Sequence, residues 1–125
     1  MTRILIADDD RTTRLLLSET LRAQKFTVVS VADGAAALKK LKAGKFDLAL
    51  LDVWMPGMNG IELCRSLDAP GRHLPTVLMS GLDDERTAQM MREANTVASL
   101  FKPFDEKQLM RAIRKALSKG ANLLH

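Results

Sequence analysis

The sequence lacks tyrosine and is poor in other aromatic residues and in cysteine. Among its 125 residues are four phenylalanines, one tryptophan and a single cysteine, Cys64. One cysteine excludes a framework of intramolecular disulfides and is typical of a reducing compartment. Only four consecutive apolar residues follow Arg3, too few for a signal-peptide core, and no apolar run approaches the roughly 18 residues of a membrane span. We therefore expect a soluble, cytoplasmic protein without a membrane partner.

Most of the chain also carries no net charge. The formal net charge is +4, but residues 1–101 carry as many acidic as basic side chains, so the excess lies from Lys102 onward. This distribution excludes a diffuse basic surface of the kind that binds nucleic acids. The positive charge is instead confined to the last helix. A basic helix of this kind is more often a solvated face or a docking surface for an acidic protein than a nucleic-acid-binding element. Its basic residues are Lys107, Arg111, Arg114, Lys115 and Lys119.

The apolar residues fall alternately into strand and helix patterns. They make up 46% of the sequence, enough for the core of one domain. Short runs rich in Val, Ile and Leu predict strands at 4–7, 27–31, 48–51, 76–79 and 97–101. Helical spacing predicts helices at 14–24, 34–43, 61–67, 83–95 and 105–118. This alternation implies parallel strands joined by right-handed crossovers, and so a doubly wound α/β sandwich of three layers.

The patterns also distinguish strands and helices by their burial. Four of the apolar runs are nearly continuous and predict strands buried on both faces, whereas Ser30 interrupts the run 27–31 and predicts an edge strand. Helix 83–95 has few apolar side chains, among them Met91, so it should be the least firmly held helix. Asp33 is expected to cap the helix that follows it.

Polar side chains follow four of the five predicted strands. They are Asp8, Asp9 and Asp10 after the first strand, Asp52 after the third, Ser80 after the fourth and Lys102 after the fifth; Gly81 follows Ser80, and Pro103 follows Lys102. Sites in doubly wound sheets form at the carboxyl ends of the strands. We therefore expect carboxylates, a hydroxyl and an ammonium to converge at this edge, except that Asp10 more simply caps the next helix.

Such a cluster favours one kind of chemistry. Asp8, Asp9 and Asp52, held within a few ångströms, would repel one another unless a cation neutralised them. Carboxylate oxygens select a hard divalent ion, so we expect Mg²⁺, with Mn²⁺ as an alternative. A carboxylate beside such an ion can attack phosphorus as a nucleophile, and Lys102 can then offset the charge of the phosphoryl oxygens.

Four segments resemble a known family, in order and in spacing. They are residues 4–10 (ILIADDD), 51–60 (LDVWMPGMNG), 77–81 (VLMSG) and 101–104 (FKPF). They resemble the receiver domain of two-component response regulators, of the kind found in chemotaxis regulators. The resemblance implies a flavodoxin-like (βα)5 fold with strand order 2-1-3-4-5. It also implies a receiver domain over residues 1–119, with 120–125 as a C-terminal tail or the start of a truncated linker.

The resemblance implies a role for each matched residue of the metal site. Asp52 matches the phosphoacceptor, which also faces the metal ion. Asp9 matches a direct Mg²⁺ ligand and Asp8 a ligand that acts through water. Trp54 matches a ligand that acts through its backbone carbonyl.

The other matched residues surround the phosphoryl group. Ser80 matches the switch hydroxyl, Gly81 offers its backbone N–H, and Lys102 pairs with the phosphate; the Lys102–Pro103 bond is cis in the family. The implied function is that of a regulator rather than an enzyme. A histidine kinase or phosphotransfer protein would donate a phosphoryl group to Asp52. A downstream protein would then bind the face made by the fourth helix, the fifth strand and the fifth helix.

Two other functions use similar residues. A dehalogenase-type phosphatase also uses an aspartate nucleophile and Mg²⁺, but it needs a second aspartate where this chain has Trp54. A receiver-like domain that acts only as a constitutive interaction module would lack at least one of the residues that match the family's phosphorylation site. None of these residues is missing here. The phosphorylated regulator is therefore the favoured interpretation.

The chain departs from the family at Ser99, where the family has an aromatic switch residue three positions before the lysine. A serine cannot fill the cavity that an inward-swinging ring fills. We therefore expect the signal to travel through the loop after Ser80 and through helix 83–95. Trp54 and Leu82 are bulky neighbours of the phosphoacceptor, so they should shield its acyl phosphate and slow hydrolysis.

Overall fold

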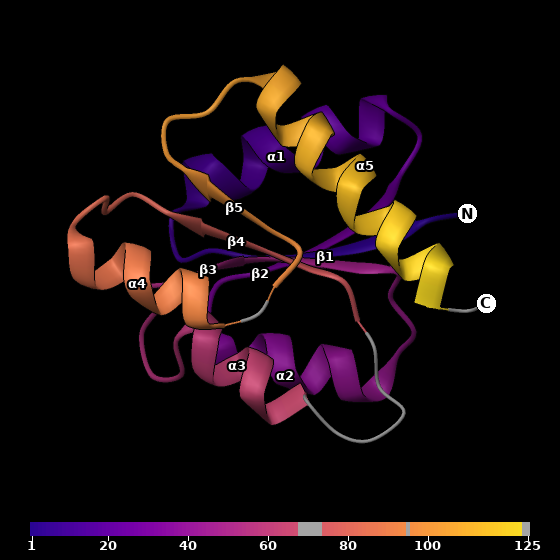
Figure 1. Ribbon diagram of the computed structural model, residues 1–125. Helices are drawn as coiled ribbons and strands as arrows, with labels where there is room; N and C mark the ends of the chain where they lie inside the picture. The colour runs from indigo at the N-terminus through magenta and orange to yellow at the C-terminus, as the bar shows by residue number, and fades with distance from the viewer. Residues whose placement is uncertain (68–73, 95, 124–125) are drawn as a thin grey trace.

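Strands and helices alternate along the chain in the computed structural model (Figure 1). The structure describes residues 1–67, 74–94 and 96–123, with side chains as far as residue 118. Its strands are β1 (Arg3–Ala7), β2 (Thr27–Val31), β3 (Leu48–Asp52), β4 (Thr76–Ser80) and β5 (Ala98–Phe101). Its helices are α1 (Arg11–Ala23), α2 (Gly34–Ala43), α3 (Gly60–Leu67), α4 (Glu85–Glu93) and α5 (Glu106–Leu123). All predicted elements are present in the predicted order.

The strands form one parallel sheet in the order β2-β1-β3-β4-β5. Figure 1 shows α1 and α5 on one face of this sheet and α2 and α3 on the other. Helix α4 contributes Met91 to the core on the α2 and α3 side. This arrangement confirms the predicted flavodoxin-like, doubly wound sandwich of three layers.

The burial predicted for the fifth strand is wrong. In the part of the chain that the structure describes, β5 pairs only with β4, so it is an edge strand. Its Leu100 is buried, but Ser99 and Phe101 are exposed. A continuous apolar run cannot distinguish a central strand from a terminal one, because the difference depends on which neighbours pair with it. The other edge is β2, as its interrupted run predicts.

Two apolar cores, one on each face of the sheet, hold the layers together. Successive residues of a strand point to opposite faces. Ile4 and Ile6 of β1 therefore join the core beneath α1 and α5, whereas Leu5 and Ala7 join the core beneath α2 and α3. Burial on both faces accounts for the continuous apolar runs of the central strands.

Aspartate side chains begin three of the helices. Asp10, Asp33 and Asp84 cap α1, α2 and α4, and each accepts the backbone N–H of the residue three positions further on. Because of the Asp10 cap, α1 begins at Arg11, three residues before its predicted start. The first turn of α1 is polar, so its sequence carries no apolar signal. Helix α5 continues to Leu123, beyond its predicted end at residue 118.

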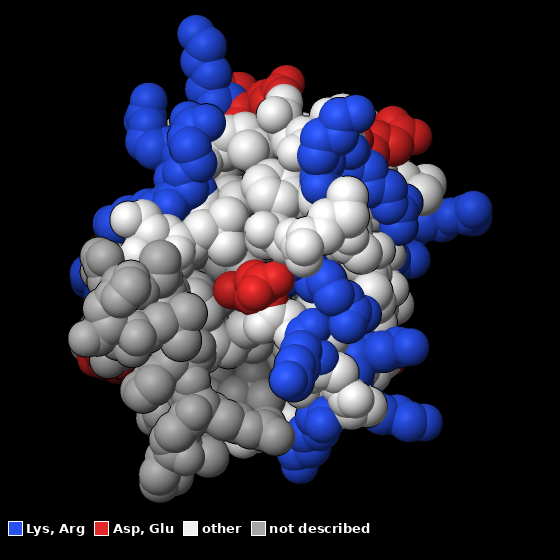
Figure 2. Space-filling model, turned by 90° about the vertical axis from the view of Figure 1, so that its right-hand side faces the viewer, with Lys and Arg blue, Asp and Glu red and all other residues white. Residues whose placement is uncertain are grey.

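The end of the sheet where the strands begin is rich in basic side chains. Figure 2 looks at this end, the right-hand side of Figure 1, and shows Lys and Arg at many points with few Asp and Glu between them. On α5, Arg111, Arg114 and Lys115 are exposed, in agreement with the positive charge of the last segment. Within the described ranges, no helix combines the length and the hydropathy needed to cross a membrane.

Candidate functional site

The carboxyl ends of four neighbouring strands bring the predicted site residues together. Asp52 and Ser80 are the last residues of β3 and β4. Asp8 directly follows β1, and Lys102 directly follows β5. Because β1, β3, β4 and β5 are adjacent in that order, all four side chains start from one edge of the sheet. This convergence is the one that the strand-end pattern predicts.

Lys102 reaches across this edge to two carboxylates. Its ammonium Nζ donates to Asp8 Oδ2 at 2.6 Å and to Asp52 Oδ2 at 2.9 Å. Asp8 is fully buried and Asp52 is 4% exposed, whereas the Lys102 side chain keeps 22% of its exposure. Charge-assisted hydrogen bonds of this length are strong where little water competes. The lysine therefore ties the ends of β1 and β3 to the loop after β5.

The charge at this edge is negative on balance. Burial raises the pKa of the Asp52 carboxyl and the charge of Asp8 adds to that rise, whereas Lys102 and the backbone N–H of Trp54 oppose it. Burial alone would lower the pKa of Lys102, but its hydrogen bonds and charge interactions with Asp8 and Asp52 raise it overall. Lys102 is thus a fixed positive charge, and it offsets only part of the negative charge around Asp52.

Asp8, Asp9 and Asp52 together fit a divalent metal ion. Each offers a carboxylate oxygen, and the three oxygens lie within 4.8 Å of one another. Asp9 is exposed, so an ion held here can keep water molecules among its ligands, as Mg²⁺ usually does. A donor set made of carboxylate oxygens suits Mg²⁺ or Mn²⁺ better than metals that prefer nitrogen or sulfur. The donor chemistry therefore agrees with the expected metal site.

Trp54 lies in the loop after β3, and Ser80 and Gly81 lie where β4 ends and the next loop begins. The backbone N–H of Trp54 donates to Asp52 Oδ1 at 3.0 Å. Ser80 is fully buried, and its hydroxyl donates to the Leu82 carbonyl at 3.1 Å and accepts the Leu82 N–H at 3.0 Å. Gly81 is exposed, and no described residue other than its two chain neighbours comes within 4 Å of the place where a β-carbon would stand. In this structure the Ser80 hydroxyl therefore stabilises its own turn.

A match to a known protein family spans all of the site residues described above. The sequence model of the response regulator receiver domain family matches residues 4–114. This chain belongs to that family. The Lys102–Pro103 peptide bond of the receiver domain is cis, as the resemblance implies.

The receiver domain is similar to proteins and structures from several organisms. It is 34% identical over 118 residues to the DNA-binding response regulator MtrA of Mycobacterium tuberculosis, a match that covers 94% of this chain and 51% of MtrA. The receiver domain of a signal transduction histidine kinase from Syntrophus aciditrophicus has a TM-score of 0.88 and 29% identity, covering 95% of this chain and 92% of that one. The response regulator TrrA of Thermotoga maritima, in complex with Mg²⁺–BeF, has a TM-score of 0.83 and 29% identity, covering 94% and 100%. The chain spans about half the length of the first curated relatives it matches.

The sequence does not predict that one buried polar residue, Thr87, lies near the site of this receiver domain and contacts Trp54. Thr87 of α4 is 1% exposed, and its Oγ1 accepts the indole N–H of Trp54 at 3.2 Å and donates to Asp84 Oδ2 at 3.1 Å. The pattern Asp-x-x-Thr at residues 84–87 could have indicated a capped helix. Nothing in the sequence indicates that Trp54 reaches the same hydroxyl.

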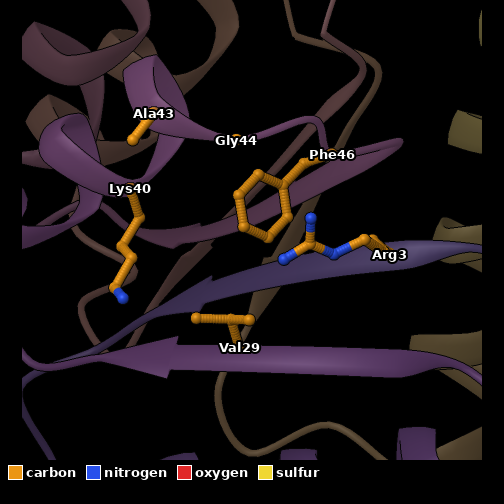
Figure 3. Close-up of a pocket in the computed structure, with 6 residues that line it drawn as sticks. All are labelled: Arg3, Val29, Lys40, Ala43, Gly44 and Phe46. Carbon is orange, nitrogen blue, oxygen red and sulfur yellow. The ribbon is translucent and has the colours of Figure 1, made fainter.

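A cavity of about 310 Å³ lies at the opposite end of the sheet (Figure 3). Its lining residues are Arg3, Val29, Lys40, Ala43, Gly44 and Phe46. Arg3 begins β1, whereas Asp8 follows the other end of that strand. The side chains of the lining offer no carboxylate, hydroxyl or thiol that could accept a phosphoryl group. This cavity is therefore separate from the acidic cluster at the carboxyl ends of the strands.

Proposed function

We propose that this receiver domain is a phosphorylation-controlled switch with Asp52 as its phosphoacceptor. The observation that carries the proposal is the Asp52 carboxylate itself, which is buried, is hydrogen-bonded by Lys102 and lies beside Asp8 and Asp9. Its negative charge is only partly offset, which suits a carboxylate that acts as a nucleophile. The phosphoryl donor is the phosphohistidine of a histidine kinase or of a phosphotransfer protein.

The reaction forms one bond and breaks one. A carboxylate oxygen of Asp52 attacks the phosphorus of the phosphohistidine, the P–N bond breaks, and the imidazole nitrogen leaves with the electron pair. The product is an acyl phosphate on Asp52. The chemistry that Mg²⁺ supplies, when Asp8, Asp9, Asp52 and the Trp54 carbonyl hold it, is positive charge that neutralises the phosphoryl oxygens.

The chain's own residues hold the new group in place. Lys102 already lies between Asp8 and Asp52, so its ammonium stays within reach of the added oxygens and offsets their charge. The Ser80 hydroxyl exchanges its bond with Leu82 for one to the phosphoryl group, and the Gly81 N–H donates beside it. Because Ser80 now holds its own turn, this exchange changes the loop that leads into α4.

The downstream partner is a protein that binds the face formed by α4, β5 and α5. On this face β5 exposes Phe101, which keeps 40% of its surface, and α5 adds exposed basic residues. An acidic protein surface around an apolar group would be complementary to it. The DNA binding named for MtrA belongs to a protein about twice as long, and we assign none to this chain. In this role the domain regulates a partner and assists its own phosphorylation and dephosphorylation.

Labelling by a small phosphodonor tests the proposed function. Intact-mass measurement after incubation with acetyl phosphate should show one phosphoryl group on the wild-type chain, with Mg²⁺ and not without it. Asp52→Asn should remain unlabelled. Asp83→Asn is the matched control, since Asp83 is an exposed carboxylate in the loop after Ser80, and it should label like the wild type. Equal labelling of wild type and Asp52→Asn would refute the assignment.

A further inference from the structure

Trp54 is hydrogen-bonded both through its backbone and through its side chain. Its backbone N–H donates to Asp52 Oδ1 at 3.0 Å, and its indole Nε1–H donates to Thr87 Oγ1 at 3.2 Å. Both are ordinary hydrogen-bond distances. The residue that contacts the phosphoacceptor carboxylate is thus also bonded to α4.

Thr87 extends this connection to the first turn of α4. Its Oγ1 donates to Asp84 Oδ2 at 3.1 Å, and its backbone N–H donates to Asp84 Oδ1 at 2.9 Å. Asp84 is the N-cap of α4, the position that satisfies free backbone N–H groups at the start of a helix. A displacement of the Trp54 indole therefore acts on the residues that fix where α4 begins.

Few other contacts hold α4 in place. Of its nine residues, only Thr87 and Met91 are buried. Met91 packs in the core beneath α2 and α3, with Met90 and Ala94 partly buried against the same core. Methionine side chains adapt to shifted neighbours, so they do not fix the helix in one position. Each polar contact of α4 therefore contributes a larger share of the interactions that fix the position of this helix than it would in a well-buried helix.

We propose that the Trp54–Thr87 hydrogen bond couples the state of Asp52 to α4, in a domain whose Ser99 offers no aromatic ring for this purpose. The proposal rests on the proposed function, because it needs a phosphoryl group on Asp52. Formation of the acyl phosphate replaces the charged Asp52 carboxylate with an uncharged acyl group, which accepts the Trp54 N–H more weakly, so the loop after β3 adjusts. The indole moves with its backbone, and Thr87 and the cap of α4 follow. Trp54 and Thr87 are positioning residues in this process.

Hydrogen exchange of α4, measured with and without Mg²⁺ and beryllofluoride, tests the coupling. TrrA forms a Mg²⁺–BeF complex, which makes beryllofluoride a suitable phosphoryl mimic. Trp54→Phe removes the indole N–H but keeps an aromatic ring, and Thr87→Val removes the hydroxyl but keeps the side-chain shape. Thr87→Ser is the matched control, because it keeps the hydroxyl. Fluorine NMR of the same samples measures whether beryllofluoride binds.

The wild type and Thr87→Ser should show a change in α4 exchange when the mimic binds. In Trp54→Phe and Thr87→Val this change should shrink about fivefold, the factor that one neutral hydrogen bond contributes to a local opening equilibrium. An equal change in all four proteins would overturn the coupling. An equal loss in Thr87→Ser and Thr87→Val would also overturn it, because the hydroxyl would then be irrelevant. Failure of the wild type to bind the mimic would instead overturn the proposed function of Asp52.

Discussion

Gly60, the first residue of α3, lies against the main chain of Asp52, the proposed phosphoacceptor. Its N–H donates to the Val53 carbonyl at 2.9 Å. A β-carbon at this position would overlap the carbonyl oxygen of Asp52, and it would lie 3.0 Å from the Asp52 carbonyl carbon and 3.3 Å from the Val53 Cα. All three are main-chain atoms at the end of a central strand, so they cannot rotate aside. Gly60→Ala must therefore move β3 or α3.

The cost of this movement can be worked out from the contacts. Overpacking typically costs about 1–3 kcal/mol, and rigid main-chain partners place this case at the upper end. Alanine returns up to about 1 kcal/mol through its helix propensity. We therefore expect a net loss of about 2 kcal/mol. At about 2.1 cal/mol/K per residue, the unfolding entropy of this chain converts that loss into a melting temperature lower by about 8 °C.

Thermal unfolding followed by circular dichroism measures this loss. Gly44→Ala is the matched control, since its β-carbon would lie 3.6 Å from the Lys40 carbonyl oxygen and from Phe46, which are ordinary contacts. Its backbone is extended, so alanine fits there, and the control should stay within about 1 kcal/mol of the wild type. If Gly60→Ala melted together with Gly44→Ala, the close packing of α3 on β3 would be refuted.

Four further outcomes follow from the site and the core. Asp52→Asn should stabilise the metal-free protein by about 1 kcal/mol at neutral pH. Burial raises the pKa of Asp52, so the ionised carboxylate lowers the stability of the wild type at pH values above that pKa. Below pH 3.8, the ordinary pKa of an aspartate, the wild-type carboxyl is protonated as well. Calorimetry should therefore show that the stability advantage of Asp52→Asn disappears there. Mg²⁺ at about 100 times its Kd should add about 2.7 kcal/mol in a thermal titration, and Asp9→Asn should lose most of that gain. Ile113→Ala removes a fully buried side chain and should cost about 2–5 kcal/mol in urea unfolding. Phosphorylated Asp52 should hydrolyse slowly in a phosphate-release assay and faster in Trp54→Ala, whereas a wild-type half-life of seconds would contradict shielding by Trp54 and Leu82.

The secondary structure followed from local patterns wherever the signal itself was local. Helix α2 begins and ends where its pattern predicts, because Asp33 caps it and Gly44 terminates it. The polar first turn of α1 carried no apolar signal, so the predicted start was three residues late. The burial of β5 was wrong for a different reason, since an edge position is a property of the sheet and not of the strand.

The acidic site was predictable because parallel strands align their carboxyl ends. Asp8, Asp52 and Lys102 each follow a predicted strand directly, so strand order was enough to bring them together. The contact between Trp54 and Thr87 was not predictable. The two residues are 33 positions apart, and a threonine near a helix start usually bonds within its own cap, as Thr87 also does with Asp84.

The sequence by itself determined which chemical groups stand at the strand ends, because alternation of strands and helices allows few topologies and a parallel sheet gathers those ends at one edge. Only the tertiary structure decided how these groups affect one another. The pKa of Asp52 is raised because layers of helix and sheet bury it beside Asp8. Trp54 is bonded to α4 because the loop after β3 lies close to that helix, and Gly60 must be glycine because α3 packs on β3. Burial, charge repulsion and close approach arise between segments distant in the chain, so no local pattern contains them.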